Sequence, residues 1–162
     1  MEKQEIYDLL DAQSIWYEVT EHKAVYNMAE VSEIDLPYPE ANAKNLFLRD
    51  SKRGGYHLIT ARGDRRVDLK AFRQQSHIRS LNFASPEELL EILGLIPGAV
   101  TPLGLLNDRE RVVTLWMDKV FLEPPGLIGV HPNDNTATVW LRTEDLLHIL
   151  RQHGNQVMLF EG

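Results

Sequence analysis

The chain has no cysteine among its 162 residues. This absence excludes disulfide bonds, zinc sites built on thiolates and a cysteine nucleophile. No apolar run approaches the roughly 20 residues that span a bilayer, and residues 1–5 do not lead into a signal-peptide core. We therefore expect a cytoplasmic protein with no membrane partner.

Several motifs with well-defined chemistry are also missing. The sequence has no Gly-x-Gly-x-x-Gly or Walker motif, so nothing in it indicates a nucleotide cofactor. It also has no Gly-x-Ser-x-Gly elbow, so nothing indicates a serine hydrolase. His148 and His153 are five residues apart in an expected helix and do not share a face, which argues against a dedicated metal site. We expect an activity that needs no cofactor and no metal.

The composition is that of an ordinary globular protein, with 43% hydrophobic and 25% charged residues, and the length fits a single domain over residues 1–162. Apolar spacing and capping patterns predict helices over 3–12, from 27 to before 36, over 68–75, from 86 to a stop at Gly94, and from a Thr143 cap to about 154. Expected strands cover 15–19, 45–48, 56–60, 112–115, 120–122, 128–130, 136–141 and 157–160.

In the middle of the chain these expected strands follow one another without long helices between them. This order favours an α/β protein of the α+β kind, with a mixed, mostly antiparallel twisted sheet flanked by helices, over a doubly wound parallel fold.

Charge is distributed unevenly along the chain. The net charge is −7, yet residues 44–79 hold ten basic and three acidic residues, a net +7, which leaves −14 on the rest. Such a segment either attracts a polyanion or is simply a solvated basic face. The basic residues are Lys44, Arg49, Lys52, Arg53, Arg62, Arg65, Arg66, Lys70, Arg73 and Arg79.

Three segments are candidates for a site. Residues 97–104 contain two prolines and two glycines, so the loop is rigid and a ligand can approach its backbone N–H groups; a structural turn is the alternative. Lys44 precedes an apolar strand and is either a surface charge or a point charge for phosphate. His131 ends an apolar strand and is followed by proline, although a single histidine is more often structural than catalytic.

Together these segments resemble the prolyl-tRNA editing family (the YbaK-like family). Its members are free-standing aminoacyl-tRNA deacylases related to the editing domain inserted in many bacterial prolyl-tRNA synthetases. The resemblance extends over essentially the whole chain and rests on AKNLFLRD at 43–50, GAVTPLGL at 98–105 and GVHPN at 129–133, before TATV at 136–139. Within the family, the sequence is most similar to the subgroup that hydrolyses Ala-tRNA(Pro).

The resemblance implies roles for the matching residues. Gly98 and Pro102 match a Gly-x-x-x-Pro loop whose backbone holds the terminal adenosine and the ester, and Lys44 matches a lysine near the terminal phosphate or ester. We count Lys44, Gly98 and Pro102 as catalytic. The expected substrate-binding residues, which include an apolar pocket wall, are Met28, Val31, Asn45, Thr101 and His131. The expected tRNA-binding residues are Arg49, Lys52, Arg53, Arg65 and Arg66.

The implied chemistry agrees with the missing triad and metal. An aminoacyl ester is already activated, so positioning, an oxyanion hole and the adenosine's own hydroxyl suffice to bring a water to attack. One methylene changes binding in an apolar pocket by only about 1–3 kcal/mol, so a synthetase that misactivates alanine needs a second site. Expected partners are mischarged tRNA and either prolyl-tRNA synthetase or a translation factor.

Three alternatives remain open. The same deacylase could act on tRNA charged with cysteine, serine or threonine. The fold could instead serve as a non-catalytic tRNA-binding or regulatory module. An enzyme for small free esters would make the basic segment irrelevant.

Overall fold

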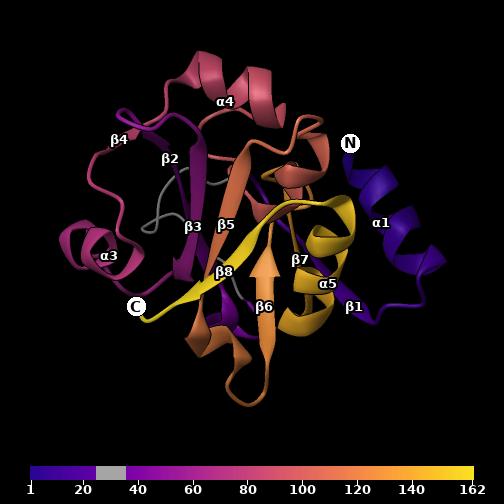
Figure 1. Ribbon diagram of the computed structural model, residues 1–162. Helices are drawn as coiled ribbons and strands as arrows, with labels where there is room; N and C mark the ends of the chain where they lie inside the picture. Colours follow the sequence, from indigo (N-terminus) through magenta and orange to yellow (C-terminus); the bar gives the residue numbers. More distant parts are fainter. Residues whose placement is uncertain (25–35) are drawn as a thin grey trace.

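The structure is a computed structural model that describes residues 1–24 and 36–162. The helix expected to begin at Asn27 lies outside these residues. The strands form two sheets (Figure 1). The smaller sheet is antiparallel in the order β1-β7-β6, with bounds β1 Tyr17–Glu21, β6 Leu127–Val130 and β7 Ala137–Arg142.

The larger sheet has five strands in the order β4-β2-β3-β5-β8. Strand β2 is antiparallel to β4 and β3, whereas β3, β5 and β8 run parallel to one another. The bounds are β2 Ala43–Asp50, β3 Tyr56–Arg62, β4 Leu81–Phe83, β5 Val113–Asp118 and β8 Val157–Phe160. The predicted α+β class with mixed, mostly antiparallel pairing is confirmed, and the pairing is divided between two sheets.

Helices begin where the sequence supplies caps. Ser85 and Glu88 form a capping box before α4, Pro86 occupies its first turn, and Gly94 ends it at φ +66°, a conformation that glycine adopts without strain. The α-helices are α1 Lys3–Ala12, α3 Leu69–Ser76, α4 Pro86–Leu93 and α5 Thr143–His153, and the 3₁₀ helices are η1 Pro39–Ala41, η2 Pro102–Asn107 and η3 Lys119–Leu122. No helix in the described part of the chain is long and apolar enough to cross a membrane.

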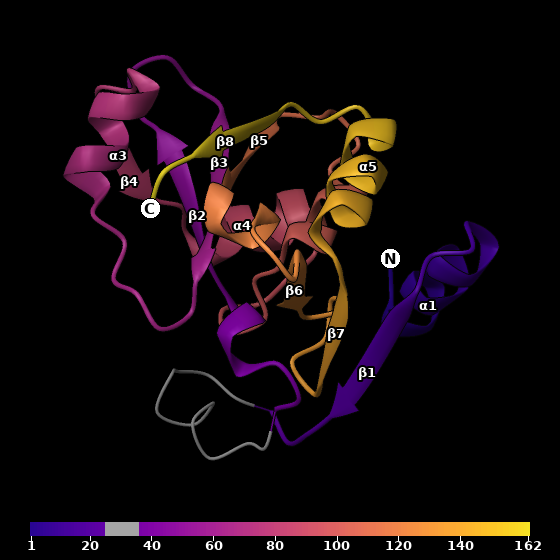
Figure 2. The same ribbon diagram turned by 90° about the horizontal axis from the view of Figure 1, so that it is seen from below.

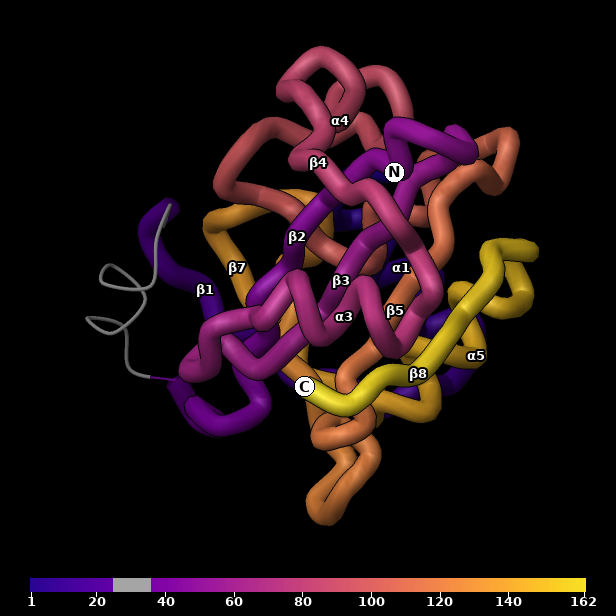
Figure 3. The backbone as a smooth tube through the Cα atoms, turned by 60° about the vertical axis from the view of Figure 1, so that its left-hand side comes forward, coloured from indigo at the N-terminus to yellow at the C-terminus, as the bar shows by residue number. Residues whose placement is uncertain are grey.

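The five-stranded sheet is buried on both faces, and its two faces have different neighbours. Because strand side chains alternate, Phe47 lies in a large core with α1, α4, α5 and the smaller sheet, whereas Leu48 lies in a second core with Phe72 of α3. We call these the inner face and the α3 face. Figure 2 shows α3 on one side of β2 and β3 and the smaller sheet on the other, and Figure 3 looks onto the α3 face.

The two sheets meet beside the start of β2, where Asn42 and Gly129 form an isolated parallel bridge. Gly129 is opposite Trp140 on β7, and a Cβ at Gly129 would lie only 2.2 Å from the Trp140 ring. The fully buried indole therefore requires glycine here. This packing fixes the strand that leads into His131.

Some local predictions were wrong. Residues 120–122 form η3 and not a strand, because the Asp118 carboxylate accepts a hydrogen bond from the Val120 N–H and starts a helical turn. Thr143 does not cap α5; the N-cap is Arg142, and the Thr143 hydroxyl donates to the Phe121 carbonyl at 2.6 Å. The first strand begins two residues later than expected, and β4 was not predicted.

Candidate functional site

The loop between α4 and η2 begins with a tight turn. The Ala99 N–H donates to the Ile96 carbonyl at 3.1 Å, with Pro97 and Gly98 at the two central positions. Gly98 has φ +91°, which is the positive φ that a type II turn needs at its third residue, and Pro97 favours the second. The pair explains why the predicted loop has this sequence.

Thr101 links this loop to the strand end at His131. Its hydroxyl donates to the His131 carbonyl at 2.7 Å and accepts from the Leu103 N–H at 3.3 Å, which caps η2. Pro102 occupies the first turn of η2, where an N–H is not needed. Thr101 is fully buried, so both hydrogen bonds are shielded from water and hold the loop in place.

Asn45 links the same loop to β2. Its Nδ2 donates to the Val100 carbonyl at 3.3 Å, and its Oδ1 accepts from the Thr60 hydroxyl at 2.7 Å. Thr60 is opposite Asn45 on β3 and is fully buried. The side-chain amide is therefore held at both ends, and predicted residues from three distant segments meet at one loop.

Three backbone donors of the loop have no acceptor in the part of the chain that the structure describes. Within residues 1–24 and 36–162, the N–H groups of Gly98, Val100 and Thr101 donate no hydrogen bond to the protein. Thr101 is buried and Gly98 and Val100 are half-buried, and buried N–H groups are normally paired. Donors held ready in a rigid loop are suited to binding an oxyanion or a ligand oxygen.

His131 is held in one orientation and one tautomer. Its Nδ1 donates to the Ala137 carbonyl at 2.9 Å, which leaves Nε2 as an acceptor. Burial lowers the pKa of His131, the Ala137 carbonyl opposes this shift, and His22 lowers the pKa further. The His131 and His22 rings lie 6.1 Å apart, centre to centre. The imidazole is therefore suited to accept a hydrogen bond near neutral pH.

Lys44 is separated from these residues by the pleat of β2. Successive side chains point to opposite faces, so Asn45 lies on the inner face while Lys44 shares the α3 face with Leu46 and Leu48. Strand β4 pairs with β2 only at 48–50. Lys44 therefore lies at an edge of the sheet that β4 leaves open.

The remaining predicted residues are distributed over the molecule. Met28 and Val31 lie outside the described residues. Arg65 and Arg66 follow β3, near the Lys44 end of the sheet. The other predicted tRNA-binding residues are at or near the hairpin turn, which lies at the far end of the eight-residue strand β2, roughly 25 Å from its start. Those residues are Arg49, Lys52 and Arg53.

The hairpin turn lines one side of an open hollow on the α3 face. Four basic residues line it, and no carboxylate does so in the described chain; they are Arg53, Lys70, Arg73 and Arg79. We call this surface the basic hollow. Much of the excess positive charge of residues 44–79 is gathered there, on the sheet face opposite Asn45 and Phe47.

The sequence did not predict three side chains that help to build the site. Thr60 holds Asn45, while the His22 ring accepts or donates with the Thr138 hydroxyl at 2.9 Å and lies beside His131. Their only signal in the sequence is their position in or next to a strand. In the described residues no group of three or more His, Asp or Glu side chains could hold a metal ion.

Solved structures support the fold. The chain aligns over 99% of its length with 96% of a chain solved as a candidate trans-editing enzyme for prolyl-tRNA synthetase, at a TM-score of 0.69 and 21% identity. A hypothetical protein gives a TM-score of 0.68 at 17% identity, with 97% of both chains covered. The architecture is therefore that of a known class of α+β domains.

Sequence comparison identifies the family. Residues 22–149 match the family described as the aminoacyl-tRNA editing domain, and this chain belongs to it. The prolyl-tRNA editing protein ProX of Acetoanaerobium sticklandii is 40% identical over 159 residues, which cover 98% of this chain and 96% of ProX. The prolyl-tRNA synthetase associated domain-containing protein 1 of Bos taurus is 35% identical over 93% of this chain and 89% of its own length.

Proposed function

We propose that this protein is a trans-editing deacylase that hydrolyses the ester of mischarged proline tRNA, with Ala-tRNA(Pro) as its substrate. The observation that carries the proposal is the loop at Gly98–Pro102, which Asn45 and Thr101 hold in place while three of its N–H groups have no acceptor among the described residues. A relative named as a prolyl-tRNA editing protein matches nearly end to end.

In this proposal the loop backbone stabilises the charge that develops on the ester oxygen. Such donors are most effective when they are already oriented before the reaction. The two hydrogen bonds from Asn45 and Thr101 provide that orientation. A hydroxyl of the terminal adenosine directs the attacking water, so no protein nucleophile is required.

His131 contributes to the choice of amino acid. Because Nδ1 is engaged by Ala137, the ring is fixed and acts as a wall with one acceptor nitrogen. We propose that it narrows the pocket together with Met28 and Val31, so that alanine enters and proline does not. A difference this small in apolar volume is sorted better by exclusion than by affinity.

Lys44 supplies a positive charge for the terminal phosphate at the open edge of β2. A lysine suits this task because its ammonium is a compact charge on a flexible stem. We expect Lys44→Ala to raise KM more than it lowers kcat and Lys44→Arg to retain most activity. If Lys44→Ala kept the full rate and the wild-type KM, this role would be wrong even with the editing function intact.

The test is a time course of ester loss from proline tRNA charged with alanine, cysteine, serine, threonine or proline. We expect the alanyl ester to be lost fastest and the prolyl ester to be spared. Faster loss of another amino acid would keep the deacylase and change its specificity. If tRNA bound and no ester were hydrolysed, the protein would be a tRNA-binding module. If only small free esters were hydrolysed, tRNA would not be the substrate.

A further inference from the structure

A small cavity lies on the α3 face, away from the candidate editing loop. Its volume is about 80 Å³. It is located where the three parallel strands end: Ala61 is next to last in β3, while Asp118 and Phe160 end β5 and β8. Residues from the ends of all three parallel strands therefore line one cavity, which is a candidate for a second binding site.

The floor of this cavity is a buried carboxylate with one unused oxygen. Asp118 is 2% exposed; its Oδ1 accepts from the Val120 N–H at 3.0 Å, and its Oδ2 has no hydrogen-bond partner in the described structure. Burying a carboxylate oxygen without a hydrogen-bond partner is costly. Arg62 interacts with Asp118 only weakly, because the pKa of Arg62 is raised mainly by its hydrogen bonds with Asp64 and to a smaller degree by Asp118. Gly162 lies so close that a Cβ on it would be 2.1 Å from Oδ2, so the chain approaches this oxygen without providing a donor.

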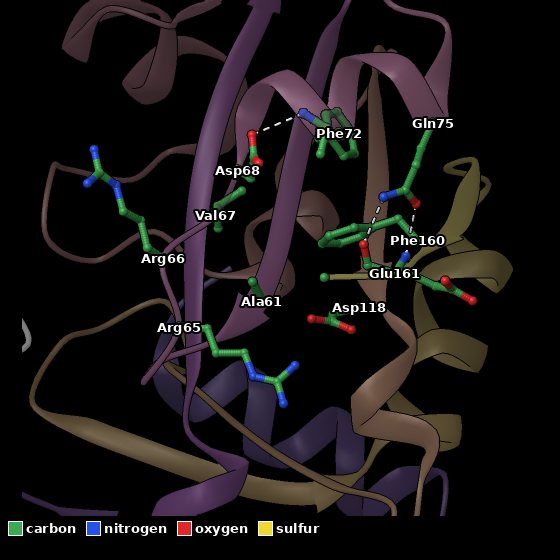
Figure 4. A pocket seen from close by; sticks show the side chains of 12 residues that line it. Ala61, Arg65, Arg66, Val67, Asp68, Phe72, Gln75, Asp118, Phe160 and Glu161 are labelled. Carbon is green, nitrogen blue, oxygen red and sulfur yellow. Dashed lines mark hydrogen bonds between the residues drawn. The ribbon is translucent and has the colours of Figure 1, made fainter.

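The walls of the cavity are apolar and firmly held. The Phe72 and Phe160 rings pack edge to face with centres 5.4 Å apart, and both line the cavity. Gln75 of α3 donates to the Glu161 carbonyl at 2.9 Å and accepts from the Glu161 N–H at 3.2 Å (Figure 4). This clamp ties the end of β8 to α3, so the cavity has a defined shape.

An arginine provides the opposite charge. Figure 4 shows that the Arg65 guanidinium points toward the Asp118 carboxylate, whereas the Arg66 side chain points away from that carboxylate. Arg65 is exposed and also lies near Asp64, whose pKa is lowered mainly by its hydrogen bond with Arg62 and to a smaller degree by Arg65. A ligand with a cationic and an anionic group would satisfy both side chains through charge-assisted hydrogen bonds.

We propose that this cavity binds a small free α-amino acid. The ammonium group faces the Asp118 carboxylate, the ligand carboxylate faces Arg65, and the ligand side chain packs against Phe72 and Phe160. A volume of about 80 Å³ is about half that of the roughly 150 Å³ cavity that holds a benzene molecule. Alanine, glycine and serine therefore suit the cavity better than aromatic amino acids do.

The test is calorimetric titration of the full chain with alanine, phenylalanine, methylamine, and two forms of alanine that lack one charge, N-acetylalanine and the methyl ester. We expect saturable binding of alanine, at about millimolar Kd for so small a ligand. The other four compounds should bind at least about tenfold more weakly, because each lacks one charge or exceeds the volume. No saturable binding of alanine, or methylamine binding as tightly as alanine, would overturn the proposal.

Variants separate this cavity from the editing loop. Asp118→Asn, Arg65→Ala and the cavity-filling Ala71→Leu should each weaken alanine binding at least about tenfold, while Arg109→Ala, which lies outside the cavity, and Asn45→Ala should leave it unchanged. Circular dichroism confirms that each variant folds, and Ala71→Leu keeps the test valid if Asp118→Asn does not fold. Binding that is lost in Asn45→Ala and kept in Asp118→Asn would place the amino acid at the editing loop and overturn the proposal.

Discussion

The candidate sites on the two faces of the five-stranded sheet use polar groups in different ways. On the inner face, Asn45 and Thr101 bond to the backbone at Val100 and His131 across long sequence distances. On the α3 face, Asp118 Oδ2 has no hydrogen-bond partner in the part of the chain that the structure describes, and four basic residues gather in an open hollow. Side chains that are bonded to the protein fix geometry, whereas side chains that are not are available to a diffusible ligand.

Under the proposed function, the chemistry belongs to the inner face and binding to the α3 face. Catalysis by backbone donors depends on position, and a shift of about 1 Å can cost about a hundredfold in rate. Attraction of a polyanion depends on total charge and tolerates individual losses. Perturbing the inner face should therefore affect the rate far more than perturbing the α3 face.

The largest expected effect is that of Thr101→Val. Valine has nearly the same shape and removes both the hydrogen bond to the His131 carbonyl and the cap of η2. We expect Ala-tRNA(Pro) hydrolysis to fall by about 10- to 100-fold, because the loop donors lose their orientation. Single-turnover kinetics measure the effect, with Thr114→Val on β5 as the control, and a rate within twofold of wild type would contradict it.

Gly129→Ala should perturb the junction between the sheets. A Cβ 2.2 Å from the Trp140 ring forces the indole or the strand to move, which should lower the free energy of unfolding by about 1–3 kcal/mol. Urea denaturation measures this loss. The smaller ring in Gly129→Ala/Trp140→Phe should make the double variant less destabilised than the sum of the two single variants, and simple additivity would argue against a clash.

Stability should also fall as the solution is acidified. Burial lowers the pKa of His57, which accepts a hydrogen bond from the Trp116 indole, and of His131. The unfolded chain then binds protons at a higher pH than the folded chain, so the stabilisation is complete above the unfolded pKa near 6.5 and is lost as pH falls through the folded values.

Melting temperatures at several pH values between about 7.5 and 5 check this expectation. Replacing His57 by glutamine, which also offers an acceptor to Trp116, should flatten the dependence. A melting temperature that rises on acidification would mean that the two histidines gain protons on folding, contrary to their burial.

The smallest effect is expected at the basic hollow. Arg73→Ala should raise the Kd for tRNA about two- to fivefold and reduce the salt dependence of binding by about one counterion, with kcat unchanged. Filter binding at several salt concentrations measures both quantities. Arg109→Ala, outside the hollow, is the control; an equal effect in the two variants would mean that net charge alone matters.

Local signals in the sequence predicted local structure well. The α4 helix was found because Ser85, Pro86 and Gly94 each have a specific role at a helix end. The apolar run at 120–122 resembled a strand because nothing in its composition reveals the Asp118 cap. Strand β4 has only three residues, too few to show a period.

Long-range relations could not be predicted in the same way. The three motif segments identified the residues Asn45, Thr101 and His131, but the hydrogen bonds that join them cross 55 and 30 residues. Basic residues that are close in the sequence are not all close in the structure. Lys44 and the hairpin turn lie at opposite ends of the eight-residue strand β2. Neighbours on a strand, such as Lys44 and Asn45, likewise point to opposite faces.

The most direct test of the account compares one variant from each face in the same assay. Ala-tRNA(Pro) hydrolysis is measured under single-turnover conditions for Asn45→Ala and Asp118→Asn, with folding verified by circular dichroism. We predict that Asn45→Ala, which removes the longer of the two bonds that hold the loop, loses about tenfold in rate, while Asp118→Asn stays within about twofold of wild type. A slow Asp118→Asn beside a fully active Asn45→Ala would contradict the assignment of chemistry to the inner face.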